Sequence, residues 1–206
     1  MQSLNKKYLL PSALIESDHP EIRSQAEKLT YSRETNQEKI KSIFYFVRDE
    51  IKYLFGMPPS ESAVKASSVL HAKKGFCTQK AILFCSLTRS CSIPSAINFY
   101  DIIDHDLSDY IARILKTRKL FRHGVPAVMI NDKWIQYDAT LDIALVQKKG
   151  LRPVEFSPDR DCLMHPTTLD GNKHIEYVHD YGLTHDVSYQ QIMHWMKQGY
   201  PHLIST

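Results

Sequence analysis

The chain has 206 residues, which suits one large domain, or a domain with an appendage, better than two complete domains. Hydrophobic residues make up 43% of it and charged residues 24%, a balance that allows a substantial core and excludes a disordered chain. The formal net charge is only +3, and Lys and Arg are scattered among acidic residues, so we expect no nucleic-acid partner.

The N-terminal segment and the cysteines indicate where the protein works. The segment MQSLNKKYLLPSALIESD has only a short apolar patch, which Pro11 interrupts, so we expect no signal peptide, no membrane span and no membrane partner. Of the four cysteines, Cys77 and Cys85 would lie about 12 Å apart on one helix, beyond the reach of a disulfide. A reducing cytoplasm is the expected location.

Three helices are predicted in the first half of the chain. Residues 18–30 form an amphipathic helix with Asp18 as its N-cap, and residues 35–53 form another that begins with a capping box of Thr35 and Glu38. A loop with two consecutive prolines follows. The stretch CTQKAILFCSLTRS then predicts a helix from Cys77 to Ser90, with Ala81, Phe84, Cys85 and Thr88 on the same face as Cys77.

A small antiparallel sheet is predicted in the second half. Residues 92–100 read as a turn and a strand, residues 107–121 as a helix with Ile114 facing inward, and residues 123–140 as a hairpin. Residues 147–186 read as loop, and a last helix begins at Ser188, where Gln191 completes a capping box, and stops at Gly199. Helices followed by an antiparallel sheet indicate the α+β class, with N-terminal helices packed on the sheet.

Cys77 is the candidate nucleophile because of its place on a helix. The N–H groups and the dipole of a helix N-terminus stabilise a thiolate, whereas Cys85 and Cys91 lie in the middle and at the end of the same helix. Gly75, just before it, would allow a tight turn and close approach of a substrate. The alternative is that Cys77 is a small buried hydrophobic residue, as free cysteines often are.

The hairpin supplies a candidate base and acid. If Asn131 and Asp132 form a two-residue loop, Val125 faces Asp138, and His123 lies diagonally across from Asp138. Diagonal neighbours are about 7–8 Å apart at the backbone, a gap that a carboxylate and an imidazole can bridge. A three-residue loop would instead turn Asp138 to the opposite face. Taken singly, the histidine could be a satisfied or exposed side chain and the aspartate a strand-end cap.

The stretches GFCTQKAILFCSLTRSCSIPSA and HGVPAVMINDKWIQYDAT resemble the core of the transglutaminase-like superfamily, and the similarity extends over residues 8–195. The resemblance implies a papain-like α+β fold and acyl transfer through a thioester. It places the nucleophile at Cys77, the general base at His123 and the orienting acid at Asp138. Ser92–Ala96 departs from the usual turn because it lacks an arginine, and a second oxyanion donor is not assigned.

These observations lead to a functional prediction. We expect a single domain over residues 1–206, with a helical lead-in at 1–60, a catalytic core at 67–145 and a loop-and-helix extension at 146–206. The expected activity is that of a cysteine-dependent hydrolase or acyltransferase acting on a peptide or protein substrate. The alternatives are a cross-linking enzyme with an amine acceptor and a non-catalytic protein-binding scaffold. No cofactor or metal is expected, because the C-terminal histidines lack ligand spacing and read as loop residues on the surface.

Overall fold

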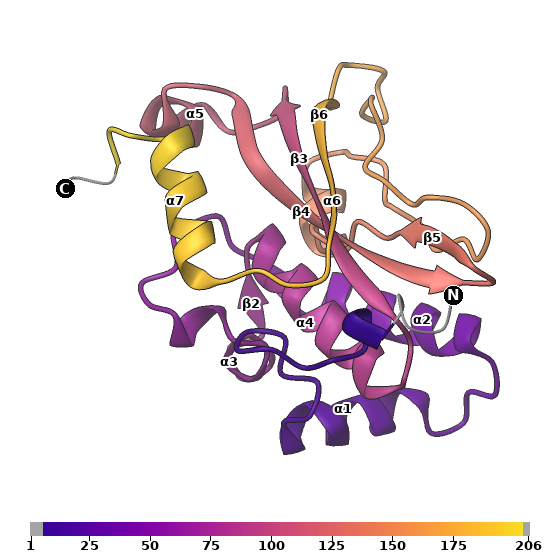
Figure 1. Cartoon of the computed structure of the whole chain (residues 1–206). Coiled ribbons are helices and arrows are strands. Elements are labelled where there is room, and N and C mark those ends of the chain that lie inside the picture. Colours follow the sequence, from indigo (N-terminus) through magenta and orange to yellow (C-terminus); the bar gives the residue numbers. More distant parts are fainter. Residues whose placement is uncertain (1–5, 204–206) are drawn as a thin grey trace.

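Helices occupy the first half of the chain and a sheet most of the second in this computed structural model, which describes residues 6–203 (Figure 1). The parts of the predicted lead-in and extension at 1–5 and 204–206 lie outside the described residues. The α-helices are α1 (Pro20–Thr30), α2 (Asn36–Tyr45), α3 (Ala66–Ala72), α4 (Cys77–Ser90), α5 (Asp109–Leu115), α6 (Ile143–Lys148) and α7 (Tyr189–Gly199). None of the helices within residues 6–203 has the length and apolarity needed to cross a bilayer.

The main sheet is antiparallel and has the strand order β5-β4-β3-β6. Its strands are β3 (Ser95–Asp104), β4 (Lys119–Ile130), β5 (Lys133–Gln136) and β6 (Ile175–Thr184). A second, short pair is parallel and joins β1 (Lys52–Tyr53) to β2 (Lys74–Gly75). This pair ties the segment after α2 to the segment that leads into α4.

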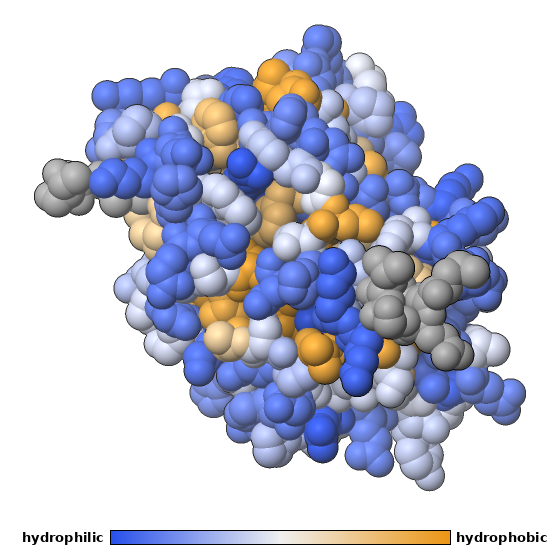
Figure 2. Space-filling model, in the orientation of Figure 1, coloured by the Kyte–Doolittle hydropathy of each residue, from blue (hydrophilic) through white to orange (hydrophobic). Residues whose placement is uncertain are grey.

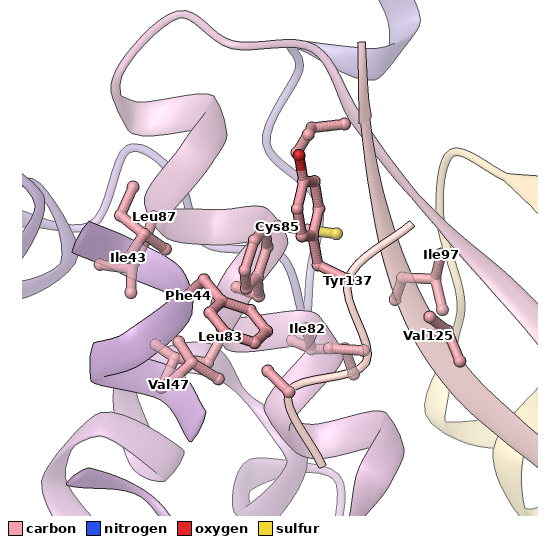
Figure 3. Packing of buried hydrophobic residues seen from close by; sticks show 14 of the residues in the cluster. Ile43, Phe44, Val47, Ile82, Leu83, Cys85, Leu87, Ile97, Val125 and Tyr137 are labelled. Atoms are coloured by element: carbon pink, nitrogen blue, oxygen red, sulfur yellow. The ribbon is translucent and has the colours of Figure 1, made fainter. Parts of the chain in front are cut away.

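Helix α4 lies at the centre of the molecule, between helices α1, α2 and α3 on one side and the sheet on the other (Figure 1). It is buried on nearly all faces, and its buried residues include polar side chains such as Lys80 and Arg89 as well as apolar ones. In Figure 3, Leu87 of α4 lies beside Ile43 of α2, Leu83 lies beside Phe44, and Ile82 lies toward Val125 of the sheet. Packing on both sides of α4 fixes the position of its first residue, Cys77.

Most predicted helix ends are confirmed. The capping boxes of Thr35 with Glu38 and of Ser188 with Gln191 are both formed, and α4 has the predicted bounds. The N-cap of α1 is His19, whose Nδ1 accepts a hydrogen bond from the N–H of Glu21, so the prediction of Asp18 was wrong by one residue. Gly75 has no positive φ and lies against the Gln79 side chain, so it makes no special turn.

Three predicted elements differ from the structure. The helix over 35–53 ends at Tyr45 and continues as a π-helical turn over Phe46–Glu50, and the helix over 107–121 is only α5, because Lys116 takes a left-handed conformation that ends it. Within α5, Ile114 is 42% exposed, so the prediction that it faces inward was wrong. The predicted loop over 147–186 contains β6, whose side chains are mostly exposed, so its apolar pattern is too weak to read.

Candidate active site

Cys77 is the first residue of α4, after Phe76, whose extended backbone (φ −84°, ψ 176°) serves as the N-cap. The side chain of Gln79 secures this turn, since its Oε1 accepts a hydrogen bond from the N–H of Phe76 at 3.0 Å. Its Nε2 donates to the carbonyl of Ala63 at 2.7 Å, which attaches the turn to the preceding loop. Cys77 is therefore held on a rigid helix start, and it is half-buried and lines a cavity.

The hairpin brings His123 and Asp138 together. Asn131 and Asp132 form a two-residue loop with positive φ angles of 51° and 62°, and Ile130 pairs with Lys133 as predicted. His123 Nε2 lies 2.7 Å from Asp138 Oδ2. The predicted hydrogen-bond geometry is confirmed, and the three-residue loop is excluded.

Asp138 is only 1% exposed, and three donors satisfy its carboxylate. Besides the imidazole, the N–H of Thr140 donates to Oδ1 at 3.1 Å and the hydroxyl of Tyr177 donates to Oδ2 at 3.0 Å. Burial alone would raise the pKa of Asp138, but the charge of His123 and the donors from Thr140 lower it below the usual range. The carboxylate is therefore ionised at neutral pH.

The charges of Cys77 and His123 stabilise each other. Burial would lower the pKa of His123, but the carboxylate of Asp138 and the thiolate of Cys77 outweigh it and raise the pKa to about 10. Burial would raise the pKa of Cys77, yet the imidazolium of His123 and the backbone N–H of Gly124 lower it below its usual value. Because Nε2 faces Asp138, Nδ1 is the nitrogen left for the sulfur. The site favours a thiolate–imidazolium pair at neutral pH.

The other cysteines have the opposite environment. All four, each within the described residues, are free thiols. Burial raises the pKa of Cys85 to about 11, and it also raises the pKa of Cys91 and of Cys162. Cys77 is therefore the thiol with the greatest thiolate character at neutral pH.

Lys80 is a site residue that the sequence reading missed. It lies one turn after Cys77 in α4, is 1% exposed, and its Nζ donates to the carbonyls of Thr140 at 2.7 Å and Arg48 at 3.1 Å. Burial lowers the pKa of Lys80 to about 7, against the opposing pull of nearby carboxylates, among them Asp138. Lys80 thus fastens the segment after Asp138 to α4. The sequence signal that could have indicated this role is a lysine among the apolar residues of a helix that is expected to be buried.

Two tyrosines were also missed. Tyr177 belongs to β6, which was read as loop, so its contact with Asp138 could not be anticipated. Tyr53 of β1 lines the same cavity as Cys77, and burial, followed by the Cys77 charge, raises the pKa of its phenol well above the usual value. Its hydroxyl therefore remains protonated.

The C-terminal histidines are not all on the surface. His174 is 2% exposed, and its Nδ1 lies 3.1 Å from the carbonyl of His165, so the prediction of a surface loop residue was wrong for His174. Within residues 6–203 no three His, Cys, Asp or Glu side chains come together as metal ligands would.

Comparison with known proteins gives a family match and a fold match. The family model described as the transglutaminase-like superfamily matches residues 23–139. The solved "Putative Cysteine Protease from Cytophaga hutchinsonii" is similar to this chain with a TM-score of 0.50 and 23% identity, covering 65% of this chain. The chain spans 40% of the length of that protein. The match shows a shared fold, and with the family model it confirms the predicted α+β, transglutaminase-like architecture.

A second solved structure, a "putative protease" from Parabacteroides distasonis, has a TM-score of 0.43 and 15% identity, and the match covers 68% of this chain and 26% of the other. None of the curated proteins compared with this chain matches it.

Proposed function

Because the chain belongs to the transglutaminase-like superfamily, we propose that it is a cysteine-dependent acyl-transfer enzyme with Cys77 as nucleophile, His123 as general base and acid, and Asp138 as the orienting acid. One observation carries the proposal most: a buried His123–Asp138 hydrogen bond of 2.7 Å beside a cysteine at a helix N-terminus. A protein-binding scaffold has no physical need for a thiolate–imidazolium pair.

The proposed reaction begins with attack of the Cys77 thiolate on an amide or ester carbonyl. A carbon–sulfur bond forms, and negative charge develops on the carbonyl oxygen, where the N–H of Cys77 at the start of α4 can donate to it. When the intermediate collapses, the bond to the leaving group breaks, and protonated His123 gives that group its proton. The product of this step is a thioester on Cys77.

The second step releases the acyl group. Neutral His123 takes a proton from the acceptor, the acceptor attacks the thioester carbonyl, and Cys77 leaves as a thiolate. Asp138 stabilises the imidazolium in both steps and keeps Nε2 occupied, so that Nδ1 stays directed at the reacting atoms. With water as the acceptor the enzyme is a peptidase or amidase, which we favour, and with an amine it is a transferase.

The test is to trap the thioester. The wild-type protein is mixed with p-nitrophenyl acetate, quenched in acid, and mapped by mass spectrometry. We expect an acetyl group on the peptide that contains Cys77, none in Cys77→Ala, and normal acylation in Cys91→Ala, the matched control. Ester cleavage by Cys77→Ala at the wild-type rate would contradict the proposal and favour the scaffold.

A further inference from the structure

A cavity of about 550 Å³ opens beside Cys77 and His123, and its walls are mostly apolar. The walls come from the segment after β1, from α5, from the first residues of β4 and from α7. In Figure 2, apolar surface gathers between the positions of α7 and α3 on this face. Representative lining side chains are Phe55, Ile111, Leu120, Ile192, Trp195 and Met196.

The lining residues contain no carboxylate and no lysine; all of them lie within the part of the chain that the structure describes. Besides the Cys77–His123 pair, the charged lining residue is Arg122. Its guanidinium stacks on the ring of Tyr181, 3.2 Å from the centroid, and faces Trp195 at 4.9 Å. Aromatic rings thus occupy the faces of this cation, which limits its use for an ionised substrate group. The cavity suits an uncharged, apolar group.

We propose that this cavity, the acyl pocket, holds an alkyl or arylalkyl acyl chain of the substrate while its carbonyl carbon is bonded to Cys77; this inference rests on the acyl-transfer function proposed above. The acyl part is the group that stays on the enzyme through both steps, whereas the leaving group must depart and the acceptor must enter. A walled, apolar space that begins at the sulfur fits the group that stays.

The size of the pocket favours a chain longer than one amino-acid side chain. An apolar cavity of about 150 Å³ already accommodates benzene. The acyl pocket is more than three times as large, since its volume is about 550 Å³. A single leucine or phenylalanine side chain would leave most of it unfilled, and unfilled apolar space forfeits packing contacts. A linear acyl chain running from Cys77 along α7 would fill it.

The first test measures binding without chemistry. Straight-chain N-methylamides from acetyl to decanoyl are titrated into Cys77→Ala, and tryptophan fluorescence and calorimetry report binding. Each methylene buried should tighten the dissociation constant about fourfold, and the gain should continue beyond the length of a leucine or phenylalanine side chain. A dissociation constant that is independent of chain length, or that stops improving at the length of a leucine or phenylalanine side chain, would overturn the proposal.

Two variants probe the pocket itself, each in the Cys77→Ala background. Ile114→Glu places a carboxylate on its wall at a position that is 42% exposed, and it should abolish the gain with chain length. Leu169→Glu is the matched control, because Leu169 is 60% exposed and lies outside the pocket, and it should bind as the parent does. Gly56→Phe should shorten the longest chain accepted, since a Cβ at Gly56 meets nothing within 4 Å and the side chain has room.

The pocket and the proposed function can fail separately. An acetyl thioester on wild-type Cys77 together with binding that ignores chain length would remove the acyl pocket and leave the enzyme. Chain-length-dependent binding without any thioester on wild-type Cys77 would contradict the enzyme and, with it, the assignment of the occupant as an acyl group.

Discussion

Replacing Tyr177 with phenylalanine tests how the site holds its buried carboxylate. The Tyr177 hydroxyl donates to Asp138 Oδ2 at 3.0 Å and accepts a hydrogen bond from the N–H of Met164 at 3.2 Å. Loss of a hydrogen bond to a charged group costs about 1.5–3 kcal/mol, and a buried N–H left without a partner costs about 1 kcal/mol or more. We expect the free energy of unfolding to fall by about 3 kcal/mol, or roughly 6–12 °C in melting temperature for a chain of this size.

The pH dependence identifies the cause of that loss. A carboxyl whose folded pKa is lowered, as that of Asp138 is, adds stability above its unfolded pKa of about 3.9 and loses it as the pH falls through the folded pKa. Removing the Tyr177 hydroxyl raises the pKa of Asp138 in the folded protein. The difference in free energy of unfolding between wild type and Tyr177→Phe should therefore be largest at pH 7 and smaller in acid. Urea unfolding at several pH values measures it.

Tyr45→Phe is the matched control, because it removes a hydroxyl that donates to Glu155 at the exposed surface, and it should cost less than about 1 kcal/mol. If Tyr177→Phe lost no more stability than Tyr45→Phe, or if its loss were equal at all pH values, the reasoning would be refuted.

Further predictions concern Asp138 and two residues close to Cys77 and His123. Asp138→Asn should slow thioester formation on the order of a thousandfold, measured by stopped-flow, because His123 loses the charge that keeps it protonated and oriented. Gly124→Ala places a Cβ 3.2 Å from Thr78 Cα, which should cost about 1–3 kcal/mol of stability in urea unfolding and move β4 away from Cys77; equal acylation rates would speak against this. Lys80→Met leaves the carbonyls of Thr140 and Arg48 without the hydrogen bonds that Lys80 donates, so we expect about 1–3 kcal/mol of destabilisation by calorimetry. An unchanged melting temperature would count against the role of Lys80 in holding the segment after Asp138 on α4.

The sequence predicts much of the local structure, because residues that are close in sequence determine helix spacing, helix caps and the hairpin turn. The helix α4 follows from apolar residues at helical spacing, and the capping box of Thr35 with Glu38 follows from side chains that satisfy nearby N–H groups. The hairpin register depends on a turn of two residues, so the diagonal contact of His123 with Asp138 follows once that turn is assumed.

Long-range contacts account for most of what the sequence does not predict. Strand β6 pairs with β3 by backbone hydrogen bonds, and the polar side chains of β6 do not predict a strand there. Tyr177 reaches Asp138 only because of that pairing. The buried amine of Lys80 meets carbonyls from residues 32 and 60 positions away. The acyl pocket likewise joins α5, β4 and α7, and no local pattern of apolar residues indicates a shared space.

Selective alkylation tests the central claim, that Cys77 is a thiolate activated by His123, most directly. Wild-type protein is treated with limiting iodoacetamide between about pH 5 and 9, a range that brackets the usual thiol pKa of about 8.5, and mapped peptide by peptide. The account predicts that Cys77 reacts at least about tenfold faster than Cys85, Cys91 or Cys162 at pH 7, because its pKa is lowered while burial raises theirs. Earlier labelling of Cys91 or Cys162, or a Cys77 rate that rises only at the pKa of an ordinary thiol, would contradict it.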